Sequence, residues 1–310
     1  MTSAPRVSVV IPTFRRPELL RPAVLSCLRQ QGIAPEQMEI VVVDNSPEAS
    51  ARALIDASKA SDAAPIPVRY VHEPRPGISH ARNAGISHAA GTLIAFLDDD
   101  EEADPLWLKA LSDCVAATGA DAVLGPVHFR FDTTSPAELE FLQWCYGRQW
   151  HGKSGEAVNN IAGMGNCMIR KDRCEGDAPF DPSLGLTGGE DLRFIVELRE
   201  RGGRVVWCRE ARVTEYCPPA RAKLSYILRR SMRRGQLYVR GFTWRRSGAV
   251  TKIATQMVIG AGQFVILGPA GLLLWYVARN AARRCLVKAA LGAGKVTWPS
   301  FLTLKGYGAS

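Results

Sequence analysis

The 310-residue sequence lacks the cysteine patterns typical of extracellular and metal-binding proteins. Its eight cysteines are scattered, without a CxxC pair or a Cys/His metal spacing, and no signal peptide precedes the first hydrophobic segment. We therefore expect reduced cysteines in a cytosolic location. Internal repeats and low-complexity tracts are also absent. With 46% hydrophobic and 22% charged residues, the composition excludes a disordered chain, a collagen and a small disulfide-rich domain.

Acidic residues are scarce in the C-terminal third of the sequence. Residues 201–310 contain 20 Lys and Arg but only two acids, Glu210 and Glu215, which gives a net charge of +18. Residues 1–200 contain 19 basic and 28 acidic residues, a net charge of −9. This asymmetry predicts that the C-terminal part meets an anionic ligand or surface, either nucleic acid or acidic lipid.

Hydrophobic runs alternate with amphipathic stretches in the first 131 residues, a pattern typical of an α/β fold with a mostly parallel sheet flanked by helices. Ligands of such sheets bind beyond the carboxyl ends of the strands. Residues 12–16, 44–46 and 98–100 each follow a strand, so we expect them to line one cleft. The predicted strands are 7–11, 39–43, 68–72, 92–97 and 122–131, and the predicted helices are 17–31, one ending near 59, 79–89 and 105–118.

The alternation breaks up after about residue 135. The most informative segments there are a strongly basic helix and, after it, 26 residues without a charge. The expected segments are a helix at 136–146, a glycine-rich loop at 151–165, a strand at 166–170, a loop at 181–189, a helix at 190–201, a strand at 205–207, the basic helix at 223–240 and the uncharged run at 253–278.

Asp98, Asp99 and Asp100 follow the hydrophobic run LIAFL. Because like charges a few ångströms apart disfavour joint ionisation, something positive should lie among them. A hard divalent cation fits, since Mg²⁺ takes one or two carboxylates and completes its shell with water and phosphate oxygens. The alternative is an acidic helix N-terminus ahead of Pro105, where carboxylates meet the helix dipole favourably.

Five segments occur in the order IPTFRRPE, VVVDNS, GISHARNAGI, FLDDDE and GGED. Together they resemble the family 2 glycosyltransferases with a GT-A nucleotide-diphospho-sugar fold, over about residues 5–215. The phrases AVLGPV, GGED and RRGQ resemble, more narrowly, the ExoM-like glucosyltransferases of succinoglycan-type exopolysaccharide assembly. That narrower similarity extends through the basic helix and to Tyr307-Gly308-Ala309.

The resemblance implies a GT-A glycosyltransferase domain at 1–220. Its donor-binding half would cover about 1–131 and its acceptor and catalytic half about 132–220. A basic helix and membrane-associated C-terminal helices would follow at 221–310.

The resemblance also implies a binding site for the base of a UDP-sugar donor. Pro12, Thr13 and Phe14 would edge the base, and Asp44 would accept a hydrogen bond from its imide N–H. For Asp44 the residues themselves leave another interpretation open, because the sequence Asp-Asn-Ser-Pro also suits a turn and a helix N-cap.

For the phosphates and the metal, the resemblance implies four further residues. Arg82, in the ARN triplet, would lie near the uridine or the pyrophosphate, although it could instead pair with an acidic neighbour. Asp98 and Asp99 would hold ribose and metal, and Asp100 would be the principal protein ligand of Mg²⁺ or Mn²⁺. Such a metal would neutralise the charge that develops on the leaving diphosphate.

The acceptor hydroxyl must lose a proton, which a carboxylate within hydrogen-bond reach can take. Asp191 fits because Gly188-Gly189 allows close backbone approach and a helix starts there. The resemblance assigns the base to Asp191 and an orienting or acceptor-binding role to Glu190. A single base and in-line displacement would invert the anomeric centre. The alternative is that both acids only favour the helix N-terminus.

Two departures from the family pattern bear on mechanism. Members often place a metal-binding histidine after the next strand, where this sequence has Thr214 and Glu215. Either Glu215 substitutes or water completes the coordination. The QxxRW motif of processive synthases is absent, which favours addition of a single sugar.

Residues 221–246 place arginine pairs among apolar and aromatic side chains. Three interpretations are open: nucleic-acid binding, a helix on the membrane surface, or arginines that pair with the acidic first part. The uncharged run at 253–278 favours the membrane, being long enough for a span. Basic residues flank both of its ends, so the positive-inside rule favours a re-entrant or in-plane hairpin, broken at Gly268-Pro269, over a single crossing.

The leading interpretation is an inverting, metal-dependent, non-processive glycosyltransferase at the cytoplasmic face of the bacterial inner membrane. It would move a hexose, most simply glucose, from a UDP-sugar to a saccharide on an undecaprenyl diphosphate carrier, without a nucleic-acid partner. A second enzymatic interpretation is direct transfer to polyprenyl phosphate. A basic nucleic-acid-binding protein without catalysis is the alternative of another class.

Overall fold

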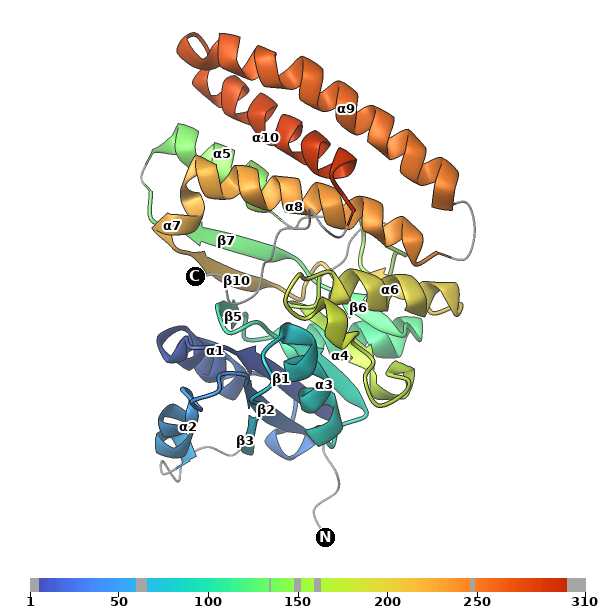
Figure 1. Ribbon diagram of the computed structural model, residues 1–310. Coiled ribbons are helices and arrows are strands. Elements are labelled where there is room, and N and C mark those ends of the chain that lie inside the picture. Colours follow the sequence, from blue (N-terminus) through green and yellow to red (C-terminus); the bar gives the residue numbers. More distant parts are fainter. Residues whose placement is uncertain are drawn as a thin grey trace. The chain divides into compact units, whose positions relative to one another are not determined.

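The computed structural model describes residues 6–59, 66–133, 135–147, 152–158, 163–245 and 249–299. Part of the predicted glycine-rich loop and the triplet Tyr307-Gly308-Ala309 lie outside these residues. Figure 1 shows the course of the chain. Its two compact units are built from Met1–His128 with Arg148–Glu215, and from Phe129–Gly147 with Tyr216–Lys305. The domain boundaries at about 131 and 220 stay a prediction.

A seven-stranded sheet lies at the centre of the first unit, with the strand order β3-β2-β1-β4-β8-β6-β9. The first four strands in that order are parallel, β8 is antiparallel to both of its neighbours, and β9 is parallel to β6. The predicted mostly parallel sheet is confirmed. The strands are β1 (Val7–Thr13), β2 (Met38–Asp44), β3 (Val68–His72), β4 (Leu93–Phe96), β6 (Ala122–Leu124), β8 (Cys167–Arg170) and β9 (Val205–Trp207).

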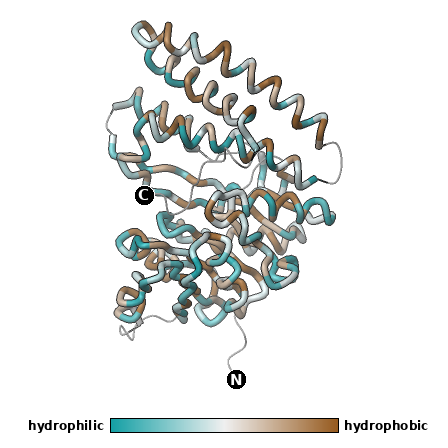
Figure 2. The backbone as a smooth tube through the Cα atoms, viewed as in Figure 1, coloured by the Kyte–Doolittle hydropathy of each residue, from teal (hydrophilic) through white to brown (hydrophobic). Residues whose placement is uncertain are grey.

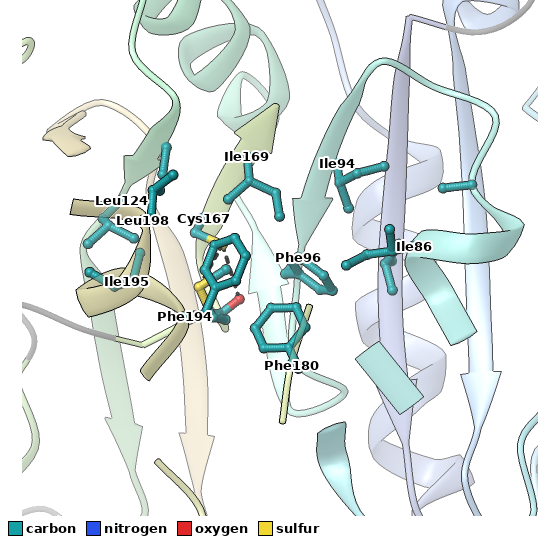
Figure 3. Packing of buried hydrophobic residues seen from close by; sticks show 14 of the residues in the cluster. Ile86, Ile94, Phe96, Leu124, Cys167, Ile169, Phe180, Phe194, Ile195 and Leu198 are labelled. Atoms are coloured by element: carbon teal, nitrogen blue, oxygen red, sulfur yellow. Dashed lines mark hydrogen bonds between the residues drawn. The ribbon is translucent and has the colours of Figure 1, made fainter. Parts of the chain in front are cut away.

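Helices cover both faces of this sheet at its centre, since every residue of β1 and β2 is buried. On one face, Ile86 of α3 and Phe194 of α6 belong to the same buried cluster as Phe96 of β4 (Figure 3). The helices of this unit are α1 (Pro17–Leu28), α2 (Arg52–Lys59), α3 (Ile78–His88), α4 (Trp107–Thr118) and α6 (Glu190–Glu200), with 3-10 turns η1 (Pro35–Gln37), η2 (Lys171–Arg173) and η3 (Pro182–Leu184).

The strand predicted at 122–131 is two strands in two sheets, so that prediction is wrong in its continuity. β6 ends at Leu124, and β7 (Val127–Phe131) joins a three-stranded sheet of order β5-β10-β7, with β5 at Glu101–Ala103 and β10 at Val213–Cys217. Gly125-Pro126 separates β6 from β7. Pro126 has no N–H for a ladder, and a Cβ on Gly125 would lie 2.2 Å from the Ala211 carbonyl oxygen.

The second unit contains most of β7, the end of β10 and a group of helices around a small apolar cluster. Phe141 and Tyr146 of α5 pack there with Ile227 of α8 and Val287 of α10. Figure 1 shows α8, α9 and α10 side by side. The helices are α5 (Pro136–Tyr146), α7 (Pro219–Ala222), α8 (Leu224–Thr243), α9 (Ala249–Leu273) and α10 (Arg279–Val296), with the 3-10 turn η4 (Leu274–Tyr276). The predicted basic helix is therefore α8.

The hairpin predicted to break at Gly268-Pro269 does not break there. α9 continues through Pro269 to Leu273, and the chain turns only at η4 before α10 begins. A proline inside a helix lacks the N–H that would donate a backbone hydrogen bond. α9 nevertheless continues, and it packs on α10 both before and after Pro269. A Cβ on Gly260 would lie 2.7 Å from the Gly292 carbonyl oxygen, and one on Gly271 would lie 2.8 Å from Leu286.

Among the described residues, α9 together with η4 is the one helical segment long and apolar enough to cross a membrane by length and composition alone. Its most apolar 18-residue window has a mean hydropathy of 1.9, and only 11% of that window is buried. Figure 2 shows this helix as largely hydrophobic. A core helix of a soluble protein would be buried, so the exposure of α9 requires an explanation.

Candidate active site

The carboxyl ends of β1, β2 and β4 bring the predicted site segments side by side. Thr13 and Asp44 are partners in the register of β1 and β2, and β4 pairs with the other side of β1. The Thr13 hydroxyl donates a hydrogen bond of 2.8 Å to Oδ2 of Asp99, although 86 residues separate the two. Residues 12–16, 44–46 and 98–100 thus lie at one edge of the sheet, as the strand pattern predicts.

Arg16 is the cation that lies among the aspartates. Its guanidinium is 3.0 Å from Oδ2 of Asp100 and 3.3 Å from Oδ1 of Asp99. Burial raises the pKa of Asp99 to about 7; Arg16 and Thr13 oppose this rise, and the charges of Asp100 and Asp98 add to it. The positive partner expected from the sequence is therefore, at least in part, an arginine from the loop after β1.

The oxygen donors at this edge suit a hard divalent cation held largely through substrate phosphates. The Asp98 side chain is 39% exposed, whereas that of Asp100 is 8% exposed and contacts Arg16. In the part of the chain that the structure describes, no three His, Cys, Asp or Glu residues surround a common metal position. The residues fit a cation bound by one or two carboxylates and a diphosphate, and the metal itself stays a prediction.

Arg82 links the acidic strand end to the GGED motif. This buried α3 side chain pairs with Glu190 at the start of α6 and lies 3.8 Å from Oδ1 of Asp98. The rings of Phe96 and Phe180 flank its guanidinium, with centroids at 6.0 and 5.6 Å. Burial acts to lower the pKa of Arg82, but the nearby acids, Glu190 foremost, outweigh it and raise that pKa. The pairing with acidic neighbours is observed; contact with pyrophosphate stays a prediction.

The two acids of the GGED motif lie in different environments. α6 begins at Glu190, directly after Gly188 and Gly189, which both have positive φ. Glu190 is buried, whereas Asp191 is partly exposed and accepts a hydrogen bond of 2.7 Å from the Leu192 N–H. Asp191 is therefore the acid that an acceptor could reach, and it also satisfies a donor in the first turn of the helix.

Asp44 is fully buried, and its carboxylate is already well supplied with hydrogen-bond donors. Oδ1 accepts from the Ser46 amide at 3.0 Å and from the Ser46 hydroxyl at 2.7 Å. Oδ2 accepts from the Ala51 amide at 2.7 Å and from the Tyr70 hydroxyl at 3.1 Å. The turn interpretation of Asp44 is observed, and recognition of a base by this carboxylate stays a prediction.

Of the three residues predicted to edge the base, only Phe14 has a partly exposed side chain. Pro12 and Thr13 are buried within β1. Arg15 follows Phe14 with its guanidinium 5.2 Å from the ring centroid and with a φ of 56°. A ring that can stack on a base is thus present at this edge, in a loop with an unusual backbone.

Two asparagines that the sequence analysis did not single out fasten the loops around the site. Asn45 donates to the Glu73 and Arg75 carbonyl oxygens at 2.8 and 2.7 Å and accepts from the Gly77 amide at 2.9 Å. Asn83 donates to the Phe180 carbonyl oxygen at 2.7 Å and accepts from its amide at 2.9 Å. Asn45 belongs to the motif VVVDNS and Asn83 to the triplet ARN, so these motifs were the sequence feature from which both could have been identified.

Glu215, the residue at the position of the family's histidine, lies in β10 opposite Glu101 of β5. Glu101 is buried and follows directly on the three aspartates. The strand register therefore places Glu215 next to Glu101, the residue that follows the three aspartates. Among the described residues, these acids form no cluster that could hold a metal ion by itself. A cavity of about 790 Å³ lies elsewhere, along α4, and none of the predicted site residues lines it.

Comparisons with known proteins agree with this fold. The family model described as "Glycosyl transferase family 2" matches residues 8–171, from β1 through β8. The chain belongs to glycosyltransferase family 2 and is a glycosyltransferase.

Particular relatives are similar over most of the chain. "Succinoglycan biosynthesis protein ExoM" of Rhizobium meliloti (strain 1021) is 34% identical over 76% of this chain and 74% of its own length. "Glucosyl-dolichyl phosphate glucuronosyltransferase" of Haloferax volcanii is 28% identical over 74% of this chain and 75% of its own. The solved structure of S. aureus TarS 1-349 has a TM-score of 0.52 at 12% identity, with 94% of this chain and 90% of that chain covered. That likeness concerns the fold alone.

Proposed function

We propose that this glycosyltransferase is inverting, metal-dependent and non-processive, and that it moves a hexose, with glucose as the first candidate, from a UDP-sugar to a lipid-linked saccharide in exopolysaccharide biosynthesis. One observation carries the proposal. Arg82 contacts both Asp98, after β4, and Glu190, at the start of α6. The acids proposed for the donor and those proposed for the acceptor thus share one buried cation.

On the donor side, Phe14 follows β1 and Asp44 ends β2, at the edge where the base would bind, and Asp98 and Asp100 follow β4 on the other side of β1. Mg²⁺ or Mn²⁺, when bound by Asp98 and Asp100 with the diphosphate, would neutralise charge on the leaving group. Thr13 and Arg16 hold Asp99 and Asp100 in place. Asp99 is buried between these two partners and shapes the site.

On the acceptor side, Asp191 takes the proton from the attacking hydroxyl. Its side chain is partly exposed, whereas Glu190 is buried on Arg82 and orients the start of α6. With a single base and attack opposite the leaving diphosphate, an α-linked donor yields a β-linked product. General-base catalysis of this kind contributes roughly 10²–10⁴ in rate.

The names of two relatives support the substrate class. ExoM is named for succinoglycan biosynthesis, and the Haloferax relative is named for transfer to a glucosyl-dolichyl phosphate. The second unit supports a location at the cytoplasmic face of the inner membrane, because residues 216–310 contain no acid and include the exposed helix α9. The acceptor would then be a saccharide on undecaprenyl diphosphate.

The test is transfer by the purified full-length chain. A panel of UDP-sugars is offered with lipid-linked saccharides from an exopolysaccharide-producing bacterium, with Mn²⁺ and with EDTA, and the anomer of the product is determined by NMR. We expect one preferred UDP-hexose, loss of transfer in EDTA and an inverted linkage. Retention of the anomer, full activity in EDTA, or transfer only to polyprenyl phosphate itself would each contradict the corresponding part of the proposal.

A further inference from the structure

The exposed apolar side chains of this protein are concentrated on one helix. Of the sixteen large hydrophobic side chains that are exposed in the described part of the chain, ten lie between residues 250 and 277, nine of them on α9 and η4 and the tenth, Val277, directly after η4. They include two series at seven-residue spacing, namely Val258, Val265 and Leu272, and Ile259, Ile266 and Leu273. Seven residues make nearly two helical turns, so each series lies along one side of α9. A contiguous exposed patch of this kind marks an interaction surface.

The opposite side of α9 is covered by α10 at very short range. A Cβ on Gly292 would lie 2.5 Å from the Gly260 carbonyl oxygen, and a Cβ on Gly271 would lie 3.1 Å from the Ala282 carbonyl oxygen. Gly260 and Gly271 are about 16 Å apart along the axis at 1.5 Å per residue. The two helices therefore run together over a long stretch, as Figure 1 shows, and α10 would have to accompany α9 if α9 crossed a membrane.

α10 cannot accompany α9 through a hydrocarbon layer without bringing its charges. It carries Arg279, Arg283, Arg284, Lys288 and Lys295, and no acid occurs in residues 216–310. Charged side chains are costly at the bilayer centre, and Lys288 and Arg279 are exposed. A crossing by α9 would place several of these cations in the hydrocarbon. A helix parallel to the surface keeps them at the level of the headgroups.

We propose that α9 is an interfacial anchor. It lies in the plane of an anionic membrane, with both exposed series, Val258, Val265 and Leu272 and Ile259, Ile266 and Leu273, in the acyl boundary. The exposed cations of α10, Arg279 and Lys288, lie among the lipid phosphates. An amphipathic arrangement of this kind binds through buried apolar area together with attraction to anionic lipid. The proposal deepens the membrane location given above and depends on it, but it does not depend on the donor, the metal or the base.

The first experiment measures binding of the full-length chain to vesicles of phosphatidylcholine and phosphatidylglycerol at 7:3, by co-sedimentation. We expect Val265→Asp/Ile266→Asp to weaken binding at least tenfold, because it places two anions in the acyl boundary. The matched control is Leu106→Asp, which adds an anion at a similarly exposed leucine of the first unit and should leave binding unchanged. Binding to pure phosphatidylcholine, or in 500 mM salt, should be several-fold weaker.

The second experiment separates a helix in the plane from one that spans. In a Cys174→Ser/Cys285→Ser background, which removes the two cysteines that are not buried, Val258→Cys, Val265→Cys and Leu272→Cys are labelled with a fluorophore. Quenching by lipids that are spin-labelled at two depths then locates each label. We expect one shallow depth for all three. A spanning helix would give steps of about 10 Å between them, and that result would overturn the proposal.

A second copy of the chain is the other occupant that such a stripe could accept. If the wild-type chain ignores vesicles and forms a dimer that Val265→Asp/Ile266→Asp dissociates, the proposal is wrong. Sugar transfer to an acceptor dispersed in detergent is measured in parallel, so that a failure of membrane binding can be distinguished from a failure of the proposed enzymatic function. The double variant should retain that transfer while it loses vesicle binding, whereas a failure of the enzymatic proposal would leave wild-type vesicle binding intact.

Discussion

Replacement of Arg82 by methionine tests whether the buried cation holds the two acidic segments together. The side chains of Arg82 and Glu190 are each 6% exposed, so Arg82→Met leaves a carboxylate in the interior without its cation. Breaking a buried pair in this way costs about 3–5 kcal/mol. For a unit of this size, that corresponds to a fall in melting temperature of roughly 6–20 °C.

Two comparisons make this prediction specific. Arg75→Met removes a pair with Glu73 in which the arginine side chain is 69% exposed, and such a pair is worth at most about 1 kcal/mol. Glu190→Gln combined with Arg82→Met removes both charges and should lose less stability than Arg82→Met alone. Urea unfolding followed by circular dichroism measures all four proteins. If Arg82→Met unfolds within 1 kcal/mol of the wild type, on the order of the exposed pair, the buried network does not hold this site together.

Three further predictions concern the site and its loops. Asp100→Ala should reduce Mn²⁺-supported transfer at least a hundredfold, or about 3 kcal/mol of transition-state stabilisation; near-normal turnover of the folded variant would remove Asp100 from the metal site. Asp191→Asn should keep the melting temperature and the donor affinity measured by calorimetry while transfer falls by roughly 10²–10⁴; an unchanged rate would leave Asp191 only its hydrogen bond in the first turn, where Asn serves nearly as well. Gly77→Ala should lower the free energy of unfolding by about 1–3 kcal/mol, because Gly77 has a φ of 134° and an added Cβ would lie 3.3 Å from the Gly185 Cα. Gly176→Ala, at a glycine with positive φ in open space, should lower it less. Equal losses of stability would refute the argument from close approach.

Local patterns in the sequence predict the central strands of the sheet well because β1, β2 and β4 are buried on both faces and therefore read as continuous hydrophobic runs. β3 and β9 have the predicted bounds, β1 has the predicted start and ends two residues later, and β2 and β4 differ from the prediction by one residue at each end. Tertiary partners are harder to predict. Arg16 pairs with acids that lie 83 and 84 positions away. Nothing in the sequence around the adjacent Arg15 and Arg16 indicates which of the two forms these pairs. Asn45 in DNSP resembles an ordinary turn residue, although it holds a loop 28 to 32 residues further on.

The C-terminal helices show the same limit. A Gly-Pro pair in an apolar run usually ends a helix, which is why a break was predicted at Gly268-Pro269. Its effect is overcome by the packing of α9 on α10, which depends on glycines on either side of the proline. No periodicity within residues 253–278 reveals that partner. Likewise, the metal-binding role of Asp98 and Asp100 is a prediction from the sequence and its family resemblance, whereas the contact of Arg16 with Asp100 is visible only in the structure.

The antiparallel strand β8 has a consequence for synthesis of the chain. β4 pairs with β1 on one side, but its other side pairs with β8, whose register partners run from Arg170, opposite Leu93, to Cys167, opposite Phe96. A ribosome that adds 5–20 residues per second needs roughly 4–15 s to make the intervening chain. During that time, an apolar strand edge stands open beside a sheet that can already form, and open edges recruit other chains. The nascent protein therefore has a defined interval of aggregation risk, which closes when β8 is made.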